Sequence, residues 1–442
     1  MIKEMQEMIV DLQSLDMDAK GRHGAIEQVK QAGIKVNNKP VAFSYVPMIV
    51  TKEDMQLFDE IIVNIQKILE KMTLHYISDQ SYRALFGFDK RIEELICLPC
   101  NNPCVIPFGR YDLFYDFESG DYAFCEINTD GSGGMSWNDH VTEAILQNYS
   151  NQKYLLDNKI ELINATDAFA KGIKEVYQAS ENAISDPLIS IVDFKEEGVL
   201  TDFEGIIDVL GKMGIRARFT DVRDLIFDGE VLRDKTDNEV IHGIYRRLVS
   251  SVLVDRYEEC RDLINAVAAK KVVLMGHFRT TLAHSKKVFS AMYHPITQAF
   301  LDEDEIQYIK KHIPETYILS ENPLTEEKLN EVRNNRNDWV LKPEEGFGSY
   351  GVLCGMDADE KTWQEKLMQA MQGGYVLQKF CKRYTIPVVR SDGEIVEQMP
   401  LMLGIFQTNG HASALYSRAA HAGVIDYSHG GVCVGAARVK YV

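Results

Sequence analysis

Apolar residues recur at helical spacing in the first part of the chain. Residues 1 to about 35 have this pattern and residues 54–85 repeat it, so both stretches are predicted to be helical. A glycine-rich loop at 129–134 precedes a further helical run at 138–146. The apolar positions in the first two stretches are Ile2, Met5, Ile9 and Leu12, then Leu57, Ile61, Ile65, Ile68 and Leu69.

Residues 188–276 alternate between short strands and helices. Residues 188–194 form an apolar run typical of a buried strand, 202–214 an amphipathic helix ending in glycine, and 215–221 a second strand. This alternation predicts a small α/β layer with parallel strands. The first turn lacks a GxGxxG sequence, so a dinucleotide-binding fold is not supported. The remaining elements are a hairpin at 224–232, a strand at 240–247 and a helix at 254–269.

The last part of the chain, from residue 286, has an α+β pattern. Residues 339–355 read as strand, charged glycine-rich turn and strand, and residues 375–380 as another strand. Residues 402–439 are rich in strands. Turn signals in this stretch lie at Asn409-Gly410 and Gly430-Gly431.

The chain of 442 residues is too long for one ordinary core. We predict three parts. Residues 1–187 would contain the N-terminal helices and the first part of the central domain core, and this part would include a metal-binding hairpin that is described below. An inserted α/β substrate-binding domain is predicted at 188–276, and a lid with the remainder of the core at 277–442.

A β-hairpin is predicted at 109–128, which reads GRYDLFYDFESGDYAFCEIN. The turn signal 118–120 separates two apolar-rich runs. If the loop is these three residues with Gly120 left-handed, Phe117 pairs with Asp121.

Four polar side chains then share one face of the hairpin. In this register Asp112 lies opposite Glu126 and Arg110 lies opposite Asn128, and side chains two apart on a strand point the same way. Two carboxylates and an amide carbonyl are hard oxygen ligands suited to Mg²⁺, which is usually held together with substrate phosphates. An adjacent arginine can clamp a carboxylate or phosphate. The hairpin is therefore interpreted as a metal–nucleotide reaction centre.

Two alternatives stay open on spacing alone. Alternating polar residues on a hairpin can form no more than a solvated face. A two- or four-residue loop would send Asp112 to the opposite side from Glu126, so an even-length loop at Ser119 would break the site.

Composition narrows the classes of function. The net charge of −18 argues against nucleic-acid binding. We find neither a membrane-spanning stretch nor a signal peptide, and expect a cytoplasmic protein without a membrane partner. Eight cysteines in such a chain suggest reduced thiols. Cys97, Cys100 and Cys104 lie close together, but no obvious further ligands complete a zinc or iron–sulfur site.

A lysine and a glycine-rich loop form a second candidate site. Lys342 ends a predicted strand, and glycines after it would let backbone N–H groups approach phosphate oxygens. The spacing is not a Walker A sequence, and a mobile hairpin is the alternative. Glu344 and Glu345 beside phosphates make sense only if a metal is present. The loop glycines are Gly346, Gly348 and Gly351.

The ordered motifs of the chain resemble a known family. Arg110-Tyr-Asp112, Glu126-Ile-Asn128-Thr129 and the loop to Gly134 resemble permuted ATP-grasp ligases, eukaryotic-type glutathione synthetase in particular. The resemblance runs from about residue 40 to the end, and glutathionylspermidine synthetase domains share the first two motifs. Further matches, in order, are Ser44-Tyr-Val-Pro47, Leu282-Ala-His-Ser-Lys-Lys287-Val, Val340-Leu-Lys342-Pro with Glu345-Gly346, Val376-Leu377 before Lys379, Leu403-Gly-Ile-Phe406, Arg418 and Gly430-Gly-Val432.

The resemblance implies a circularly permuted ATP-grasp fold, in which two α+β subdomains sandwich ATP and Mg²⁺ bridges its phosphates. Arg110 matches the catalytic arginine that stabilises the reacting carboxyl group. The implied metal ligands are Asp112, Glu126, Asn128 and Glu345. The implied ATP-binding residues are Lys287, Lys342, Gly346, Gly348, Leu377, Gln378 and Lys379. The implied substrate-binding residues are Arg110, Ser132, Arg246, Arg418, Gly430 and Gly431.

The implied function is an ATP- and Mg²⁺-dependent carboxylate–amine ligase that forms an amide through an acyl phosphate and produces ADP. The partners would be a small-molecule or short-peptide carboxylate and an amine, and homodimerisation is common among relatives. Two alternatives are an ATP-binding protein of the same fold without ligase activity and a phosphotransferase that stops at the acyl phosphate.

The chain also departs from glutathione synthetase. The loop after Asn128 is shorter, Met402 replaces a glutamate, and Arg247-Leu-Val follows Arg246 where the family has an aspartate and a tyrosine. No lysine lies two places after Arg418, and the segment from there to the next glycine pair is longer. The reaction type therefore transfers better than the substrate.

Overall fold

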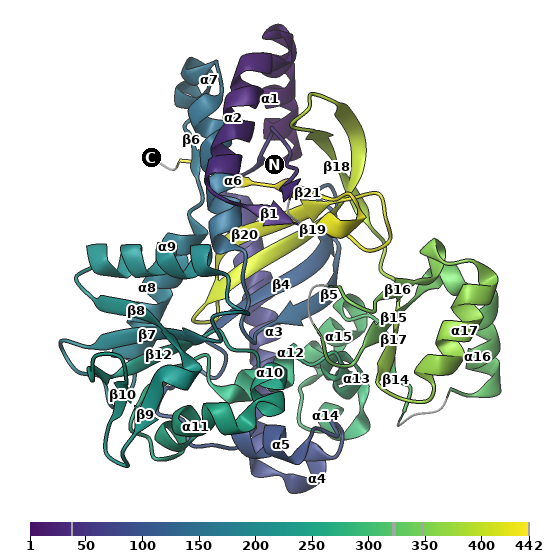
Figure 1. Ribbon diagram of the computed structural model, residues 1–442. Helices are drawn as coiled ribbons and strands as arrows, with labels where there is room; N and C mark the ends of the chain where they lie inside the picture. The colour runs from purple at the N-terminus through teal and green to yellow at the C-terminus, as the bar shows by residue number, and fades with distance from the viewer. Residues whose placement is uncertain (37–38, 321–323, 347–348, 441–442) are drawn as a thin grey trace.

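An antiparallel sheet forms the centre of the molecule (Figure 1). The computed structural model describes residues 1–36, 39–320, 324–346 and 349–440. The strand order is β21-β20-β19-β4-β5, and β18 pairs with the first half of β19. The bounds are β4 Phe108–Tyr115, β5 Tyr122–Asn128, β18 Tyr384–Val389, β19 Ile395–Thr408, β20 His411–Ala419 and β21 Val432–Val434.

Several helices from the first part of the chain, among them α1, α3, α6 and α8, pack against this sheet. The predicted first helix is two helices, because Asp16, Met17 and Asp18 have positive φ angles that a helix does not accommodate. The long helix α3 begins with a capping box at Thr51 and contacts β20, but Leu57, expected on its buried side, is 47% exposed. The bounds are α1 Ile2–Ser14, α2 Ala19–Gln31, α3 Lys52–Ser78, α4 Gln80–Arg83, α5 Lys90–Ile96, α6 Met135–Asn148, α7 Gln152–Asp157 and α8 Ala165–Gln178.

The last described strand returns to the beginning of the chain. β22, Ala436–Val439, pairs in parallel with β3, Met48–Val50, and antiparallel with β6, Ile160–Leu162. A separate two-stranded ladder joins β1, Lys35–Val36, to β2, Lys39–Pro40.

The predicted α/β layer with parallel strands is confirmed. Its sheet has the order β13-β12-β7-β8, and every pair in it is parallel. The bounds are β7 Leu188–Asp193, β8 Arg216–Asp221, β12 Gly243–Arg246 and β13 Val273–Met275, with α9 Leu200–Lys212, α10 Ser250–Asp255 and α11 Arg261–Ala268. An antiparallel ladder of β9 Leu225–Phe227, β10 Leu232–Asp234 and β11 Val240–Ile241 lies beside it.

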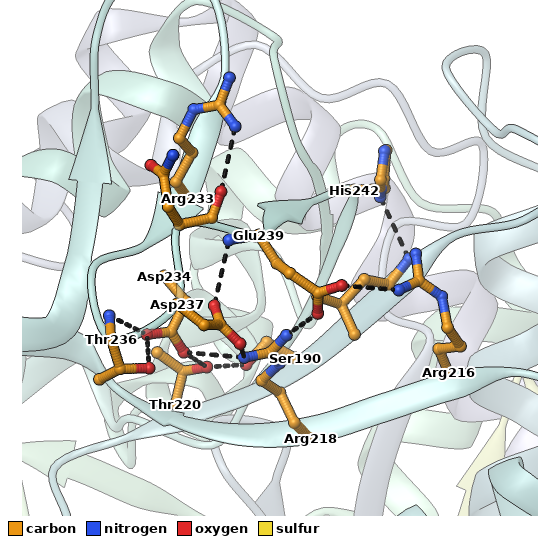
Figure 2. A network of polar contacts seen from close by, with 12 residues as sticks. Ser190, Arg216, Arg218, Thr220, Arg233, Asp234, Thr236, Asp237, Glu239 and His242 are labelled. Atoms are coloured by element: carbon orange, nitrogen blue, oxygen red, sulfur yellow. Dashed lines mark hydrogen bonds and ion pairs between the residues drawn. The ribbon is translucent and has the colours of Figure 1, made fainter.

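Paired charges tie the edge strand β8 to this ladder (Figure 2). Arg218 on β8 forms ion pairs with Asp234, Asp237 and Glu239, and Arg216 pairs with Glu239. Each arginine is neutralised by the carboxylates that it contacts. The network is therefore interpreted as structural.

A third sheet forms a lobe beside β5, which we call the lid (Figure 1). Its order is β14-β17-β15-β16, and Trp339 and Trp363 lie in a hydrophobic core of its own. Its elements are β14 Thr316–Ile318, α16 Glu326–Asn334, β15 Trp339–Pro343, β16 Leu353–Cys354, α17 Glu360–Ala370 and β17 Tyr375–Lys379. The helices α12 Thr281–His284, α13 Lys287–Tyr293, α14 Pro295–Gln298 and α15 Glu303–His312 precede it.

Among the described residues, the buried apolar side chains form two large clusters and a small third one, which contains Phe114, Met402, Ala420 and Ile425. Buried residues of the central sheet and of the parallel sheet belong to one continuous cluster, whereas the lid is packed separately. The division of the chain at 187 and 276 stays a prediction. None of the helices in the described ranges is long and apolar enough to cross a membrane.

Candidate active site

The base of the β4–β5 hairpin has the predicted pairing. Arg110 lies opposite Asn128, and Asp112 lies opposite Glu126. The four polar groups are therefore brought together, as expected from the register.

The loop of the hairpin differs from the prediction. The N–H of Asp116 donates to the carbonyl of Asp121 at 2.7 Å, which leaves residues 117–120 in the loop. Phe117 therefore does not pair with Asp121, and the predicted three-residue loop is wrong. Gly120 is left-handed as expected, with φ of 75°.

The expectation that an even-length loop breaks the site is also wrong, because a β-bulge restores the register. Asp112 pairs with Glu126, and the next residue of β4, Leu113, pairs with Phe124. Cys125 is therefore an extra, unpaired residue on β5. The bulge moves the strand by one residue, which returns Glu126 to the face of Asp112.

Arg110 is fixed from three sides. Its Nε donates to Asp112 Oδ1 at 2.7 Å and Nη2 donates to Oδ2 at 2.9 Å, a bidentate pair. Its Nη1 donates to the carbonyl of Gly133 at 3.0 Å, and its guanidinium lies 5.0 Å from the centre of the Tyr416 ring. Burial alone would lower the pKa of Arg110, but the Asp112 carboxylate raises it. The guanidinium therefore stays charged and oriented.

Asp112 holds a second arginine as well. Arg418 Nη2 donates to Asp112 Oδ2 at 3.2 Å, and Asp112 is fully buried and outside the lining of the cavity described below. Gly404 on β19 lies opposite Asp112 and makes room for it, since a Cβ there would be 2.9 Å from Asp112 Oδ1. Asp112 thus positions Arg110 and Arg418, and its predicted role as a metal ligand stays a prediction.

Glu126 and Asn128 face the cavity. Asn128 Nδ2 lies 3.2 Å from Glu126 Oε1. Burial would raise the pKa of Glu126, but Lys286 and Lys342 outweigh it, and the pKa lies below its usual range. A carboxylate beside an amide suits Mg²⁺. In the described ranges no three His, Cys, Asp or Glu side chains gather to hold a metal, so the fit requires ligand oxygens from a substrate such as a phosphate.

Lys342 connects the lid to the hairpin. Its Nζ donates to the carbonyl of Cys125 at 2.9 Å and to Gln378 Oε1 at 2.6 Å, and Gln378 Nε2 donates to Thr316 at 3.2 Å. Lys342 and Gln378 both line the cavity. These two predicted ATP-binding residues are therefore brought together with the β4–β5 hairpin.

Of the two adjacent lysines, the structure brings to the cavity Lys286, which the sequence argument passed over. Lys286 lines the cavity and donates to the carbonyl of Gly346 at 3.0 Å. Lys287 instead donates to the carbonyl of Phe86 at 2.8 Å and pairs with Glu344 at 2.9 Å, and it is not among the lining residues.

The other predicted nucleotide and metal residues are dispersed. Gly346 and Lys379 line the cavity. Leu377 is packed in the lid core, and Glu345 is exposed and outside the lining. Gly348 lies outside the described residues.

The predicted substrate-binding residues also divide into two groups. Ser132 and Arg418 line the cavity. Gly430 and Gly431 do not, and residues 423–425 of the same loop line it instead.

Arg246 is buried, and its guanidinium contacts groups inside the protein. It pairs with Asp130 at 2.5 Å, donates to the carbonyls of Gly276 and Leu248, and is 2% exposed. Its neighbour Arg247 lines the cavity.

The cavity has a volume of about 430 Å³. One part is apolar and lies between the lid and the central sheet; the charged part adjoins the hairpin. We call Arg110, Arg418, Lys286, Lys342, Asp112 and Glu126 the charged centre. The apolar part includes Phe114, Val340, Val352, Phe380, Met402 and Ile425. Such a cavity can hold a molecule with one flat apolar end and one anionic end.

No family model matches the chain, and no curated protein matches its sequence. A glutathione synthetase-like effector from Globodera pallida, solved in its apo form, superposes with a TM-score of 0.59 and 12% identity over 94% of this chain and 96% of its own. The chain has the fold of this glutathione synthetase-like protein. At this identity the likeness establishes the fold and leaves the substrate open.

Two further structures are more distant. A protein described as a gamma-glutamylcysteine synthetase, from Methylobacillus flagellatus, has a TM-score of 0.32 and 11% identity over 87% of this chain and 88% of its own. D-alanyl-alanine synthetase A from Vibrio cholerae has a TM-score of 0.27 and 11% identity over 50% of this chain and 68% of its own.

Sequence reasoning missed several groups that line this cavity. Tyr416 lies two residues before Arg418 on β20, so strand alternation could have placed both on one face. Asp193 ends a strand of the parallel sheet, where ligands of open α/β sheets gather. Lys286 carried no signal beyond its neighbour Lys287.

Proposed function

We propose that the protein is an ATP- and Mg²⁺-dependent carboxylate–amine ligase. The observation that supports this most directly is the composition of the charged centre, in which four cationic side chains face two carboxylates. The excess of positive charge lies next to the apolar part of the cavity, an arrangement that suits a nucleoside triphosphate and a second anion.

The proposed chemistry assigns each group a role. A carboxylate oxygen of the acid attacks the γ-phosphorus of ATP; the new O–P bond forms as the bond to ADP breaks. The nitrogen of the amine then attacks the acyl carbon, phosphate leaves with its bond to that carbon, and the amine loses a proton. Lys286 and Lys342 offset the charge of the transferring phosphoryl group, and Arg110 holds the developing oxyanion.

Magnesium would be held by Glu126 and Asn128, and it supplies charge neutralisation between the phosphates. We propose the permuted form of the fold, with a small-molecule or short-peptide carboxylate and an amine as partners. The lid would exclude water, because an acyl phosphate is otherwise hydrolysed.

The adjacent lysines Lys286 and Lys287 offer a matched test. Lys286→Met removes a cation from the cavity and is expected to weaken ATP binding about ten-fold or more. Lys287→Met removes a buried lysine that contacts Phe86 and Glu344, so it should lower the free energy of unfolding and leave nucleotide affinity nearly unchanged. Calorimetric titration with ATP and urea unfolding measure both effects; equal loss of ATP affinity in the two variants would contradict the assignment.

Turnover separates the ligase from its alternatives. ADP release that requires both an acid and an amine supports a ligase. Hydroxamate formation from acid, ATP and hydroxylamine, with no dependence on a second amine substrate, would instead indicate a phosphotransferase. Tight ATP binding without turnover over a broad panel of acids and amines would indicate a binding protein.

A further inference from the structure

The ring of Tyr416 contacts both arginines of the charged centre. Its centre lies 5.0 Å from the guanidinium of Arg110 and 5.5 Å from that of Arg418, and all three side chains line the cavity. A cation over an aromatic face is attracted by the electron-rich ring, and the attraction is strongest where water is excluded. Tyr416 is only 6% exposed. One buried ring therefore stabilises the directions of two guanidinium groups.

The two arginines share one buried carboxylate and are held by it unequally. Arg110 donates to Asp112 through two nitrogens, whereas Arg418 donates to it through Nη2 alone, at 3.2 Å. The buried Nε of Arg418 has no hydrogen-bond partner among the described residues. One carboxylate paired with two guanidinium groups leaves positive charge for an anion in the cavity. The direction of Arg418 depends on packing, because its hydrogen bonds are few.

The Tyr416 ring is itself held in place. A Cβ on Gly134 would lie 3.1 Å from the ring, so the end of the glycine-rich loop packs directly against it. The hydroxyl groups of Tyr416 and Tyr427 lie 2.9 Å apart, a hydrogen bond in which either oxygen can donate. The ring of Tyr427 lies 5.7 Å from that of Trp137 on α6. These contacts fix the ring that the arginines touch.

Tyr427 belongs to the segment 420–431, which connects β20 to β21 and is anchored on both sides of this residue. Before it, the N–H of Gly423 donates to Asp357 of the lid at 3.0 Å. After it, the N–H of His429 donates to Asp426 Oδ1 at 3.0 Å and closes a turn that contains Tyr427. Residues 423–425 of the segment line the cavity. The segment therefore holds Tyr427 at a fixed place beside the charged centre.

We propose that Tyr416 and Tyr427 form a positioning pair for the reaction. Tyr427 holds the Tyr416 ring, and the ring holds Arg110 and Arg418 in the directions in which they meet an anionic group of the reacting molecules. Both tyrosines act through the arginines. The inference rests on the proposed ligase function, in which Arg110 holds the developing oxyanion. It gives a purpose to the segment after Arg418, which is longer here than in glutathione synthetase.

Binding of inorganic phosphate tests the role of the ring. Phosphate, a product of the proposed reaction, is titrated by calorimetry into the full-length protein saturated with Mg²⁺ and ADP. Tyr416→Leu removes both cation–π contacts and should weaken phosphate about ten-fold or more. Tyr416→Phe keeps the ring and should weaken it no more than about three-fold. The affinity for ADP, whose phosphates are assigned to the lysines, should change less than about two-fold in each variant.

The hydrogen bond between the two tyrosines has a separate test. Tyr427→Phe should weaken phosphate about three-fold, and combining it with Tyr416→Phe should cause no further loss, because both substitutions remove the same bond. The matched control is Tyr122→Phe, which removes a hydrogen bond of 3.1 Å to the hydroxyl of Tyr308. Neither residue of this second pair is among the lining residues, and Tyr308 keeps its bond to the carbonyl of Ile61. The control should leave phosphate affinity unchanged.

Thermal unfolding establishes that each variant is folded, and if Tyr416→Leu is not, the Phe variants decide. Four results would overturn the inference: wild-type protein that binds ADP but not phosphate, wild-type phosphate affinity in Tyr416→Leu, equal losses of ADP and phosphate affinity in that variant, or absent or additive losses in the two Phe variants. Each leaves ADP binding by the wild type, and with it the proposed function, intact. Failure of the wild-type protein to bind ADP with Mg²⁺ would instead overturn the proposed function.

Discussion

At the scale of single residues, the site depends on which charge each side chain contacts. Asp112 contacts Arg110 and Arg418, whereas Glu126 faces the cavity and the lysines. Two carboxylates directly opposite each other on a hairpin therefore serve different purposes: one orients arginines and the other is available to a ligand.

Asp112→Asn and Glu126→Gln should separate these purposes. Asp112→Asn leaves two arginines without their buried carboxylate and should lower the free energy of unfolding by about 3 kcal/mol. Glu126→Gln should cost less stability but abolish most Mg²⁺-dependent ADP release. Urea unfolding and a coupled ADP assay measure the two quantities. Full activity in either variant would contradict the site assignment.

Asp193 is expected to make the free energy of unfolding depend on pH. Burial raises the pKa of Asp193 to about 6, with Arg247 opposing the shift, whereas an unfolded aspartate titrates near 3.9. Between these values the folded state binds more protons than the unfolded state, so its stabilisation falls as pH rises through that window. Above about pH 6 the cost of the buried charge is fully present.

Asp193→Asn removes this cost. We expect the variant to be more stable than the wild type at about pH 7.5, by at most about 3 kcal/mol, and the gain to shrink toward zero as pH falls to about 4. Urea unfolding at several pH values measures it. A stability difference that is the same at every pH would show that the carboxylate does not titrate in this range.

At the scale of elements, the hairpin shows how two local irregularities compensate. The four-residue loop shifts the pairing by one residue, and the bulge at Cys125 shifts it back. Turn signals in the sequence indicate where a hairpin reverses, but the position of a bulge depends on the neighbouring strands.

Deleting Cys125 tests the bulge. The deletion removes only the extra residue of β5, so Asp112 and Glu126 should stay paired in a regular ladder. It also removes the carbonyl that accepts from Lys342, and ATP-dependent turnover should therefore fall at least about ten-fold. Cys125→Ala keeps the backbone, including the carbonyl that accepts from Lys342, and should retain most activity. Comparable activity in the deletion variant would contradict the role of the bulge; circular dichroism checks that it folds.

At the scale of the whole molecule, the cavity lies where three sheets meet. The central sheet supplies the hairpin, the lid supplies Lys342 and Gln378, and the carboxyl edge of the parallel sheet supplies Asp193. Because the lid has its own hydrophobic core, we expect it to move as a unit if the proposed nucleotide binds.

Hydrogen exchange tests this coupling. ATP with Mg²⁺ should slow amide exchange in β15 and β17, since a bound nucleotide joins the lid to the hairpin. Lys342→Met removes contacts to Cys125 and Gln378 and should reduce that protection. Protection confined to the hairpin in the wild type would contradict a lid that closes over the nucleotide.

The sequence by itself determined the hairpin, the α/β layer and the motif order, because strand alternation and turn residues are local signals. It placed Arg110 opposite Asn128 and Asp112 opposite Glu126. It also placed Lys342 next to a glycine-rich loop of the kind that binds phosphate.

Only the tertiary structure decided which of two neighbouring residues faces the cavity. Lys286 rather than Lys287, and Arg247 rather than Arg246, line it. The difference within each pair is set by how α13 and β12 pack against distant segments, such as Phe86 and Asp130. The sequence of two adjacent cationic residues does not show which of them faces the cavity. The direction of each side chain depends on contacts with distant segments and on which charge can be buried.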